Sequence, residues 1–196
     1  MLFRSSHLIS ESIGSNLSTT SGPVISIPGD LSGMLTGLEQ NDILLIDEIH
    51  RINSSVEEYL YSAMEDYKID IMIDSGPAAR TVRIDLSPFT LVGATTRLGA
   101  LSTPLRDRFG AIFRLDYYSE SELFEVLKRT ANILEITIED DAIMEVALRS
   151  RGTPRIANRV LKRVRDFAQV KKIKIIKRQD ARNALEQIGI DKNGLE

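Results

Sequence analysis

Two adjacent carboxylates at the end of an apolar run are the residues in this sequence best suited to chemistry. Asp47 and Glu48 directly follow the run Ile43–Ile46. In open α/β sheets the ligand crevice lies beyond the carboxyl ends of the strands. One acid there can hold hydrated Mg²⁺, and the next can polarise an attacking water. The alternative is that the pair opens a surface loop or caps the next helix, and its position alone does not decide.

A second apolar run, Phe89–Ala94, ends in the hydroxyl residues Thr95 and Thr96. If both runs are parallel strands, these hydroxyls lie at the same sheet edge as the two acids. Thr96 could then orient a water or a terminal phosphate. A threonine at a strand end can equally be a β-branched residue that satisfies local backbone groups.

Two arginines, Arg106 and Arg108, flank Asp107 in the segment Pro104–Gly110. Either arginine could reach the phosphate of a neighbouring subunit, because the planar guanidinium engages phosphate oxygens with two donors. The alternative is a surface salt-bridge cluster formed by the Arg-Asp-Arg sequence.

A third cation, Arg155, lies in the first turn of a helix that Thr153 and Pro154 are expected to begin. A helix N-terminus already carries partial positive charge, so an arginine there fits best beside an anion such as phosphate. The alternative is an ordinary solvated arginine. The basic residues that follow, as far as Lys174, are interpreted as the solvated side of an amphipathic helix.

The elements that must position these residues form an α/β unit with a mostly parallel sheet. Ile43–Ile46 and Phe89–Ala94 are expected to be central strands buried on both faces. Between them, Val56, Leu60 and Met64 recur at helical spacing, and Asn53 or Ser54 can cap this helix.

The segment after this helix, about 69–86, alternates apolar and polar residues and predicts a long β-hairpin. A turn is expected at 75–77. A hairpin inserted between two parallel strands interrupts the core, so we expect it to project and contact a partner. The residues expected to make this contact are Ile69, Ile71, Ile73, Val82 and Ile84.

The second half of the sequence replaces strands with helices, expected at 120–134, 140–149, 154–170 and 178–188. We therefore expect a larger α/β domain over 1–117 and a small helical domain over 118–196. Gly22-Pro23 and Pro28-Gly29 are interpreted as loop signals, and the first 20 residues give the weakest pattern.

The composition restricts the class of protein. The 196 residues are 42% hydrophobic and 27% charged, with no stretch that fits a membrane span or a secretory signal, so a cytoplasmic protein is expected. There is no cysteine and there are two histidines, which excludes disulfides and thiol catalysis and disfavours a zinc site. The formal net charge of −3 argues against a generally basic, DNA-coating protein.

Taken in order, these motifs resemble the AAA+ ATPases and, among them, the RuvB family of Holliday junction branch-migration motors. The resemblance extends from about Ile13 to Gly194. It is carried by seven stretches: Thr19–Pro23, Asp47–Arg51, Ala63–Tyr67, Gly93–Arg97, Pro104–Gly110, Arg151–Asn158 and Val164–Gln169.

The resemblance implies a partial AAA+ core with an inserted hairpin and a helical lid, and it implies roles for individual residues. Asp47 and Glu48 would be the Walker B acids, and Asp47 would hold Mg²⁺ through water. Thr96 would be sensor 1, Arg108 the finger that acts on a neighbouring subunit, and Arg155 sensor 2. Four more residues would lie near the nucleotide: Glu65, Asp66, Tyr67 and Tyr118.

The same resemblance implies ATP and Mg²⁺ as cofactors and a homohexamer as the assembly. The expected partners are RuvA, which would bind the hairpin, Holliday junction or duplex DNA, and RuvC in a larger complex. No membrane contact is expected.

The sequence departs from the family pattern at the phosphate-binding loop. The printed residues contain no G-x-x-x-x-G-K-T motif, and Leu2 stands where its lysine would lie. The winged helix that follows the lid in the family is also not among these residues. Two interpretations result: a motor subunit with impaired ATP binding, or an inactive module that binds RuvA or neighbouring subunits.

Overall fold

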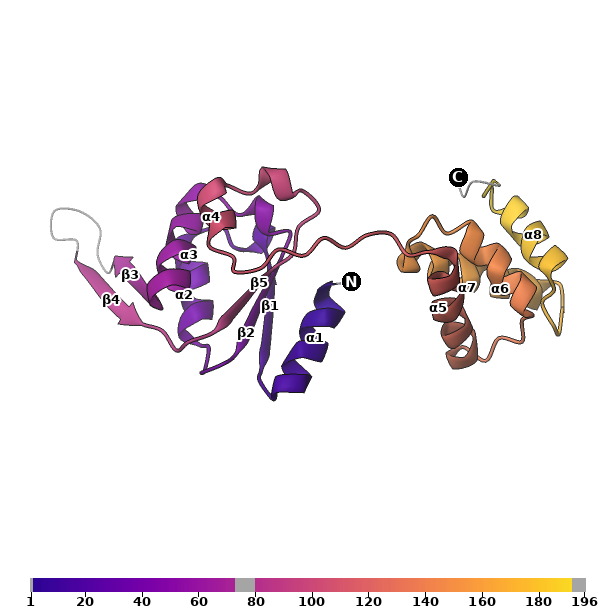
Figure 1. Ribbon diagram of the computed structural model, residues 1–196, viewed down its shortest axis with the longest axis horizontal. Coiled ribbons are helices and arrows are strands. Elements are labelled where there is room, and N and C mark those ends of the chain that lie inside the picture. Colours follow the sequence, from indigo (N-terminus) through magenta and orange to yellow (C-terminus); the bar gives the residue numbers. More distant parts are fainter. Residues whose placement is uncertain (1, 73–79, 192–196) are drawn as a thin grey trace. The chain divides into compact units, whose positions relative to one another are not determined.

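The computed structural model describes residues 2–72 and 80–191. The chain divides into two compact units, Met1–Ile112 and Phe113–Glu196 (Figure 1). The first unit combines strands with helices and the second is helical, so the α/β fold with a helical lid is confirmed.

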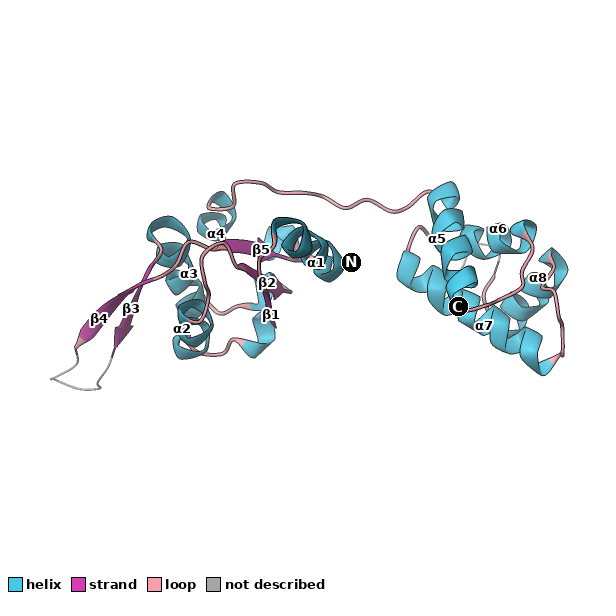
Figure 2. Cartoon of the chain, turned by 90° about the horizontal axis from the view of Figure 1, so that it is seen from below, coloured by secondary structure: helices cyan, strands magenta, loops and turns pink. Residues whose placement is uncertain are grey.

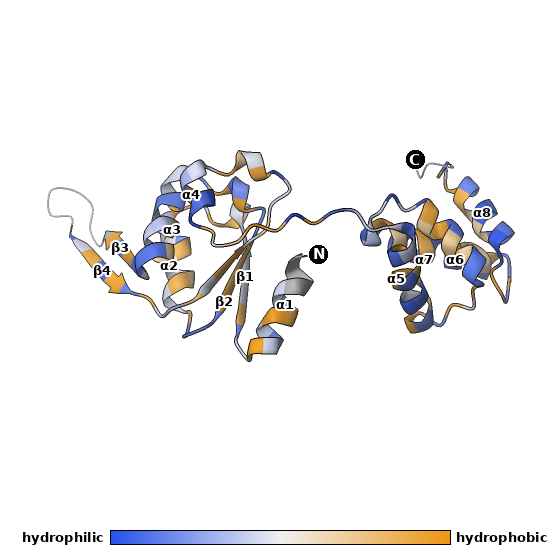
Figure 3. Cartoon of the chain, in the orientation of Figure 1, coloured by the Kyte–Doolittle hydropathy of each residue, from blue (hydrophilic) through white to orange (hydrophobic). Residues whose placement is uncertain are grey.

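The first unit is built on a parallel sheet of strand order β1-β2-β5. The strands are β1 (Leu17–Ser21), β2 (Ile43–Asp47) and β5 (Thr90–Gly93). Residues 43–46 of the central strand β2 are buried, as predicted, and they stand out as hydrophobic in Figure 3. Strand β5 is an outer strand of this described sheet and its residues are exposed or half-buried, so the prediction of a second central strand buried on both faces is wrong. Ser21 pairs with Asp47, and Ile46 pairs with Gly93, so the carboxyl ends of all three strands meet at one edge.

The first 36 residues are more regular than the sequence suggested. Helix α1 (Leu2–Ile13) precedes β1, and α2 (Pro28–Thr36) begins at the Pro28-Gly29 pair, so the prediction of a loop there is wrong. Proline is acceptable at this position because the first helical residue needs no N–H partner. The Asp30 carboxylate accepts hydrogen bonds from the Ser26 and Ile27 amides at 3.0 and 3.1 Å and fixes the helix start.

Helix α3 (Ser54–Asp66) follows β2 through the short 3-10 turn η2 (Ile49–Arg51). The Asn53 side chain caps it by accepting from the Val56 amide at 2.9 Å, as predicted. One face of α3 packs into the core of the first unit. The buried residues of that face are Val56, Leu60 and Ala63.

The predicted hairpin consists of β3 (Lys68–Met72) and β4 (Thr81–Asp85), paired antiparallel. Figure 2 shows it extending from the end of α3. Ile69 is only 1% exposed and belongs to the core, so the expectation that it faces a partner is wrong. Ile71 and Ile84 are partly buried against the same core, whereas Val82 is 41% exposed. Ile73 and the expected turn at 75–77 lie outside the described residues.

The rest of the first unit is the 3-10 turn η3 (Leu98–Ala100) and the short helix α4 (Thr103–Asp107). A further 3-10 turn, η1 (Gly22–Val24), follows β1.

The second unit contains the four predicted helices, with α5, α6 and α8 each ending one residue earlier than expected. They are α5 (Glu120–Ile133), α6 (Asp140–Leu148), α7 (Pro154–Val170) and α8 (Arg178–Gln187). Their apolar faces form one core. In the described part of the chain no helix is long and apolar enough to cross a membrane.

Candidate functional site

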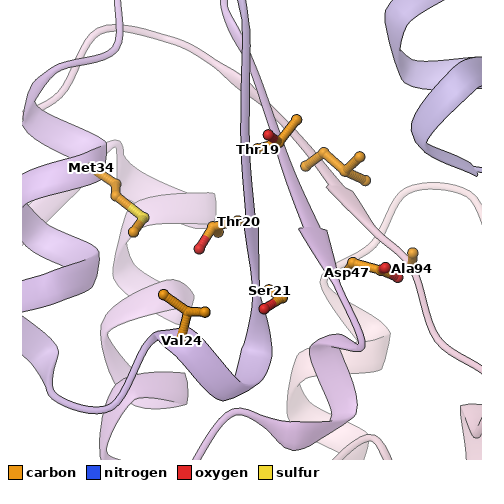
Figure 4. Close-up of a pocket in the computed structure, with 8 residues that line it drawn as sticks. Thr19, Thr20, Ser21, Val24, Met34, Asp47 and Ala94 are labelled. Carbon is orange, nitrogen blue, oxygen red and sulfur yellow. The ribbon is translucent and has the colours of Figure 1, made fainter.

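The carboxyl edge of the sheet borders a cavity of about 440 Å³. Figure 4 shows Asp47 and Ser21 at the ends of adjacent strands, with Met34 of α2 across the cavity. The lining residues are Thr19, Thr20, Ser21, Val24, Met34, Leu45, Asp47 and Ala94. The predicted acid therefore lies at a cavity formed mainly by β1 and β2.

A sharp backbone turn separates the two acids. Asp47 ends β2, and its carboxylate accepts from the Glu48 amide at 3.0 Å. Glu48 has φ of 48°, in the left-handed region that non-glycine residues rarely adopt. A Cβ added to Gly22 would lie 2.5 Å from the Glu48 carbonyl oxygen, so only glycine leaves room for this turn.

The Glu48 carboxylate contacts residues at the end of β5. The Thr96 hydroxyl donates to Glu48 Oε2 at 3.3 Å, and His50 Nδ1 lies 3.3 Å from the same oxygen. Thr95 Oγ1 lies 2.9 Å from His50 Nδ1, and the His50 side chain is 9% exposed. The structure thus brings together Glu48 and Thr96 as predicted, with Thr95 at the same edge, and adds His50, to which sequence reasoning gave no role.

The chemistry of this edge fits a hydrated magnesium ion. Mg²⁺ keeps several waters and binds through one or two carboxylates rather than in an all-protein cage. Asp47 offers one carboxylate at the cavity, with the Ser21 hydroxyl on the paired strand position. Over residues 2–72 and 80–191 no cluster of three His, Asp or Glu side chains could hold a metal directly.

Arg108 follows α4 and is held by helix α3. Its guanidinium lies 4.4 Å above the centre of the Tyr61 ring, and its Nε lies 3.2 Å from Glu65 Oε1. Its Nη1 donates to the Pro104 carbonyl at 2.8 Å. The ionic partner of Arg108 is therefore Glu65 of α3, which the sequence did not suggest.

Tyr67 ends α3 with φ of 52°, and its ring packs edge-on against Phe89 at 6.0 Å. Tyr67 and Arg108 both line a second cavity of about 210 Å³, together with Thr90 at the start of β5. Because Thr96 follows the other end of β5, the predicted residues fall into two groups. Asp47, Glu48 and Thr96 form one group, and Glu65, Tyr67 and Arg108 form the other, with Asp66 exposed beside Tyr67.

Tyr118 and Arg155 belong to the second unit, where Tyr118 precedes α5 and Arg155 lies at the start of α7. The Tyr118 amide donates to the Gly152 carbonyl at 2.9 Å, and Arg155 is exposed in the first turn. Thr153 occupies the N-cap position as predicted, but its hydroxyl bonds to the Arg151 carbonyl at 3.3 Å instead of capping the helix. The Thr153 side chain therefore accepts no hydrogen bond from the backbone N–H groups in the first turn of α7.

Replacing Gly152 by alanine is expected to destabilise the second unit by about 2 kcal/mol. Gly152 has φ of 66°, and an added Cβ would meet Tyr117 Cβ at 2.6 Å. Urea unfolding measures the loss. Gly189→Ala is the matched control, because that glycine has φ of 80° with nothing within 4 Å, so only the backbone strain remains. Equal losses in both variants would contradict the steric part of the argument.

A buried charge cluster in the second unit was not foreseen. The Glu145 side chain is 6% exposed and forms ion pairs with Arg149 Nη2 at 2.9 Å, Arg178 Nε at 3.0 Å and Arg182 Nε at 3.1 Å. Arg149 is 8% exposed and also donates to the Ile190 carbonyl at 3.3 Å. The i, i+4 spacing of Glu145 and Arg149, and of Arg178 and Arg182, is the sequence signal that could have found it. The cluster ties α6 to α8.

Comparison with known proteins gives matches over nearly the whole chain. Residues 4–115 match the family model described as the Holliday junction DNA helicase RuvB P-loop domain, and residues 118–191 match the RuvB AAA lid domain. A structure of the RuvB Holliday junction branch migration motor from Thermotoga maritima is 48% identical, with a TM-score of 0.87. Two variant forms of that protein are each 49% identical, with TM-scores of 0.88 and 0.89.

These matches cover 97% of this chain but only 59% or 60% of the Thermotoga maritima chains. The chain therefore spans about three fifths of the length of the proteins it resembles.

Proposed function

We propose a function for these residues from the premise that this chain belongs to the RuvB family. In this proposal the chain is a subunit of an ATP-driven motor for Holliday junction branch migration in DNA recombination and repair. Its residues supply the hydrolytic and intersubunit parts of the nucleotide site, and ATP with Mg²⁺ are its cofactors.

The contact between Glu48 and Thr96 is the observation that carries this proposal. A water that attacks the terminal phosphate needs a carboxylate to polarise it and a hydroxyl to report or fix its position. Glu48 and Thr96 are hydrogen-bonded at 3.3 Å, beside Asp47 at the cavity. In this proposal Asp47 holds hydrated Mg²⁺, Glu48 polarises the water, and Thr96 acts as sensor 1.

The remaining residues act around that centre. Arg155, as sensor 2, and Tyr118 contact the nucleotide from the lid. Arg108 neutralises developing charge on the phosphate of a neighbouring subunit's nucleotide, because guanidinium stabilises transferring phosphoryl groups. Glu65, Asp66 and Tyr67 lie beside that intersubunit site.

The proposed assembly is a homohexamer in the cytoplasm that acts on Holliday junction or duplex DNA, with RuvC in the larger complex. RuvA binds the hairpin, and the exposed Val82 is its apolar contact.

A second function is favoured by the separation of Arg108 from the acids. Arg108 shares a cavity with Tyr67 and Thr90, while Asp47 lines another. A chain that does not hydrolyse ATP itself can therefore still offer Arg108 to the site of an intact neighbour, or its hairpin to RuvA.

ATP turnover by the purified chain with Mg²⁺ tests the motor function, with and without RuvA and junction DNA. The motor function predicts turnover that is reduced, because the printed residues contain no phosphate-binding loop motif. This turnover should fall on the order of a hundredfold in Glu48→Gln, which keeps the shape but removes the base. The exposed Glu58→Gln on α3 is the matched control and should leave turnover unchanged. Absence of both ATP binding and turnover would leave only the second function.

A mixing assay tests that second function. The chain is added to full-length Thermotoga maritima RuvB that carries alanine at the position aligned with Arg108, and turnover by the relative is measured. Stimulation is expected from this chain but not from its Arg108→Ala variant, because a removed finger costs on the order of a thousandfold. Equal stimulation by the parent chain and by the Arg108→Ala variant would contradict the proposed role of Arg108.

A further inference from the structure

We propose that Tyr61 is a positioning residue that seats the Arg108 guanidinium on helix α3. The functional part of this inference rests on the proposed role of Arg108, whereas the seating itself is a property of the described side chains. As a consequence, the Arg108 side chain has a defined orientation at the subunit surface and does not rotate freely in solvent.

Helix α3 carries Glu57, Tyr61 and Glu65 at intervals of four residues. Residues four apart lie one above the other on a helix surface, so these three form a stripe along one face. This stripe is separate from the buried face, which holds Val56 and Leu60. The stripe therefore remains available to hold another element, and the element it holds is α4.

The N-terminal part of the stripe, Glu57 and Tyr61, fixes the start of α4. Tyr61 Oη donates to Glu57 Oε1 at 2.9 Å and lies 3.2 Å from Ser102 Oγ, and Ser102 also donates to Glu57. Ser102 is the N-cap of α4 and accepts from the Leu105 amide at 3.2 Å. Leu105 is 1% exposed, so α4 is also held by the core.

The C-terminal part of the stripe, Tyr61 and Glu65, contacts Arg108 at the end of α4. The guanidinium of Arg108 lies 4.4 Å above the Tyr61 ring centre, within the range of a cation–π contact. Its Nε lies 3.2 Å from Glu65 Oε1 without forming a hydrogen bond, and its Nη1 donates to the Pro104 carbonyl. The ring thus contacts the guanidinium at the end of α4, while the hydroxyl of the same side chain contacts Ser102 at the start of this short helix.

Tyr61 contributes more to this orientation than Glu65. The Arg108 side chain is 25% exposed, but Glu65 is 54% exposed, and ion pairs of that exposure contribute little. A phosphate arriving at Arg108 can take the place of Glu65 without disturbing the ring contact. Burial and the hydrogen bond to Glu57 raise the pKa of Tyr61, whereas the hydrogen bond with Ser102 lowers it. The pKa is raised overall, so at neutral pH the phenol keeps its proton and can donate the hydrogen bond to Glu57.

The seating is tested directly by the NMR signal of the Arg108 Nε–H group in the full 196-residue chain. In the parent chain the aromatic ring should displace this signal from the free arginine position. Tyr61→Leu should return it to that position, whereas Tyr61→Phe should keep most of the displacement because the ring remains. An unchanged signal in Tyr61→Leu would overturn the inference.

The functional part is tested in the mixing assay described above. Tyr61→Leu should lower the maximal stimulated turnover about tenfold with unchanged KM for ATP, because misplaced catalytic groups lose rate rather than ground-state binding. Tyr61→Phe should lose less. Tyr59→Leu is the matched control on another face of α3 and should stimulate like the parent chain.

The outcomes separate the two proposals. If Arg108→Ala stimulates like the parent chain, the role of Arg108 fails, whatever the NMR signal shows. If Arg108→Ala does not stimulate but Tyr61→Leu stimulates fully, the positioning role of Tyr61 is wrong. A single thermal transition in both Tyr61 variants excludes unfolding as the cause.

Discussion

Replacing Glu145 by alanine is expected to lower the free energy of unfolding of the helical unit by about 3 kcal/mol. Removing one partner of a buried ion pair leaves the other charge without compensation. Arg149 is only 8% exposed and would lose its carboxylate, whereas Arg178 and Arg182 are 52% and 39% exposed and can turn to water. The loss is therefore expected to come mainly from Arg149.

Urea unfolding followed by circular dichroism measures this loss, and hydrogen exchange in α6 and α8 locates it. Glu186→Ala, an exposed acid on α8, is the matched control and should change stability by less than about 0.5 kcal/mol. The double variant Glu145→Leu with Arg149→Met should recover much of the lost stability, because an apolar pair can replace a buried ion pair. An equal loss in Glu145→Ala and Glu186→Ala would contradict the argument.

The same carboxylate makes stability depend on pH. Burial by itself raises the pKa of Glu145. The interactions with Arg178, Arg182 and Arg149 lower it by more than burial raises it, so the folded pKa lies below its ordinary value of 4.5. A depressed folded pKa means that the unfolded chain binds the proton more readily. The contribution of Glu145 is therefore fully present above the unfolded pKa and is lost as pH falls through the folded pKa. Glu145→Ala should flatten the acid limb of the stability curve.

The sequence predicted those elements whose apolar pattern is self-contained. Residues 43–46 form an unbroken apolar run, and the helix from Ser54 has both its cap and its periodicity, so both were found. Strand β1 (Leu17–Ser21) was missed because its residues are mostly hydroxylic, and their pairing with β2 supplies the missing reason for a strand. Helix α2 was missed because Pro28-Gly29 is as typical of a helix start as of a loop.

The candidate site was predictable only where strand order decides proximity. Glu48 and Thr96 follow adjacent parallel strands, so their meeting at one edge follows from the fold class. The contacts of His50 with Thr95, of Tyr61 with Arg108, and of Glu145 with Arg178 join residues far apart in sequence. Such contacts depend on how helices and turns pack, which periodicity does not specify.

Replacing Gly22 by alanine is expected to destabilise the first unit by about 3 kcal/mol and to displace Glu48. The added Cβ would lie 2.5 Å from the Glu48 carbonyl oxygen and 3.2 Å from the Ile52 amide nitrogen. These are backbone atoms, so no side chain can move aside. The same carbonyl accepts from the Arg51 amide at 2.8 Å, which makes that amide the reporter of the displacement.

Hydrogen exchange at the Arg51 amide and urea unfolding measure the two effects of Gly22→Ala. Gly33→Ala is the matched control: Gly33 lies inside α2 with nothing within 4 Å, so its replacement should stabilise by about 0.5–1 kcal/mol. Opposite signs from the same substitution would show that the requirement for glycine after β1 comes from the left-handed turn at Glu48. Slow exchange at Arg51 in Gly22→Ala would instead mean that the turn tolerates a side chain there, and that the backbone of Glu48 is not set by close packing.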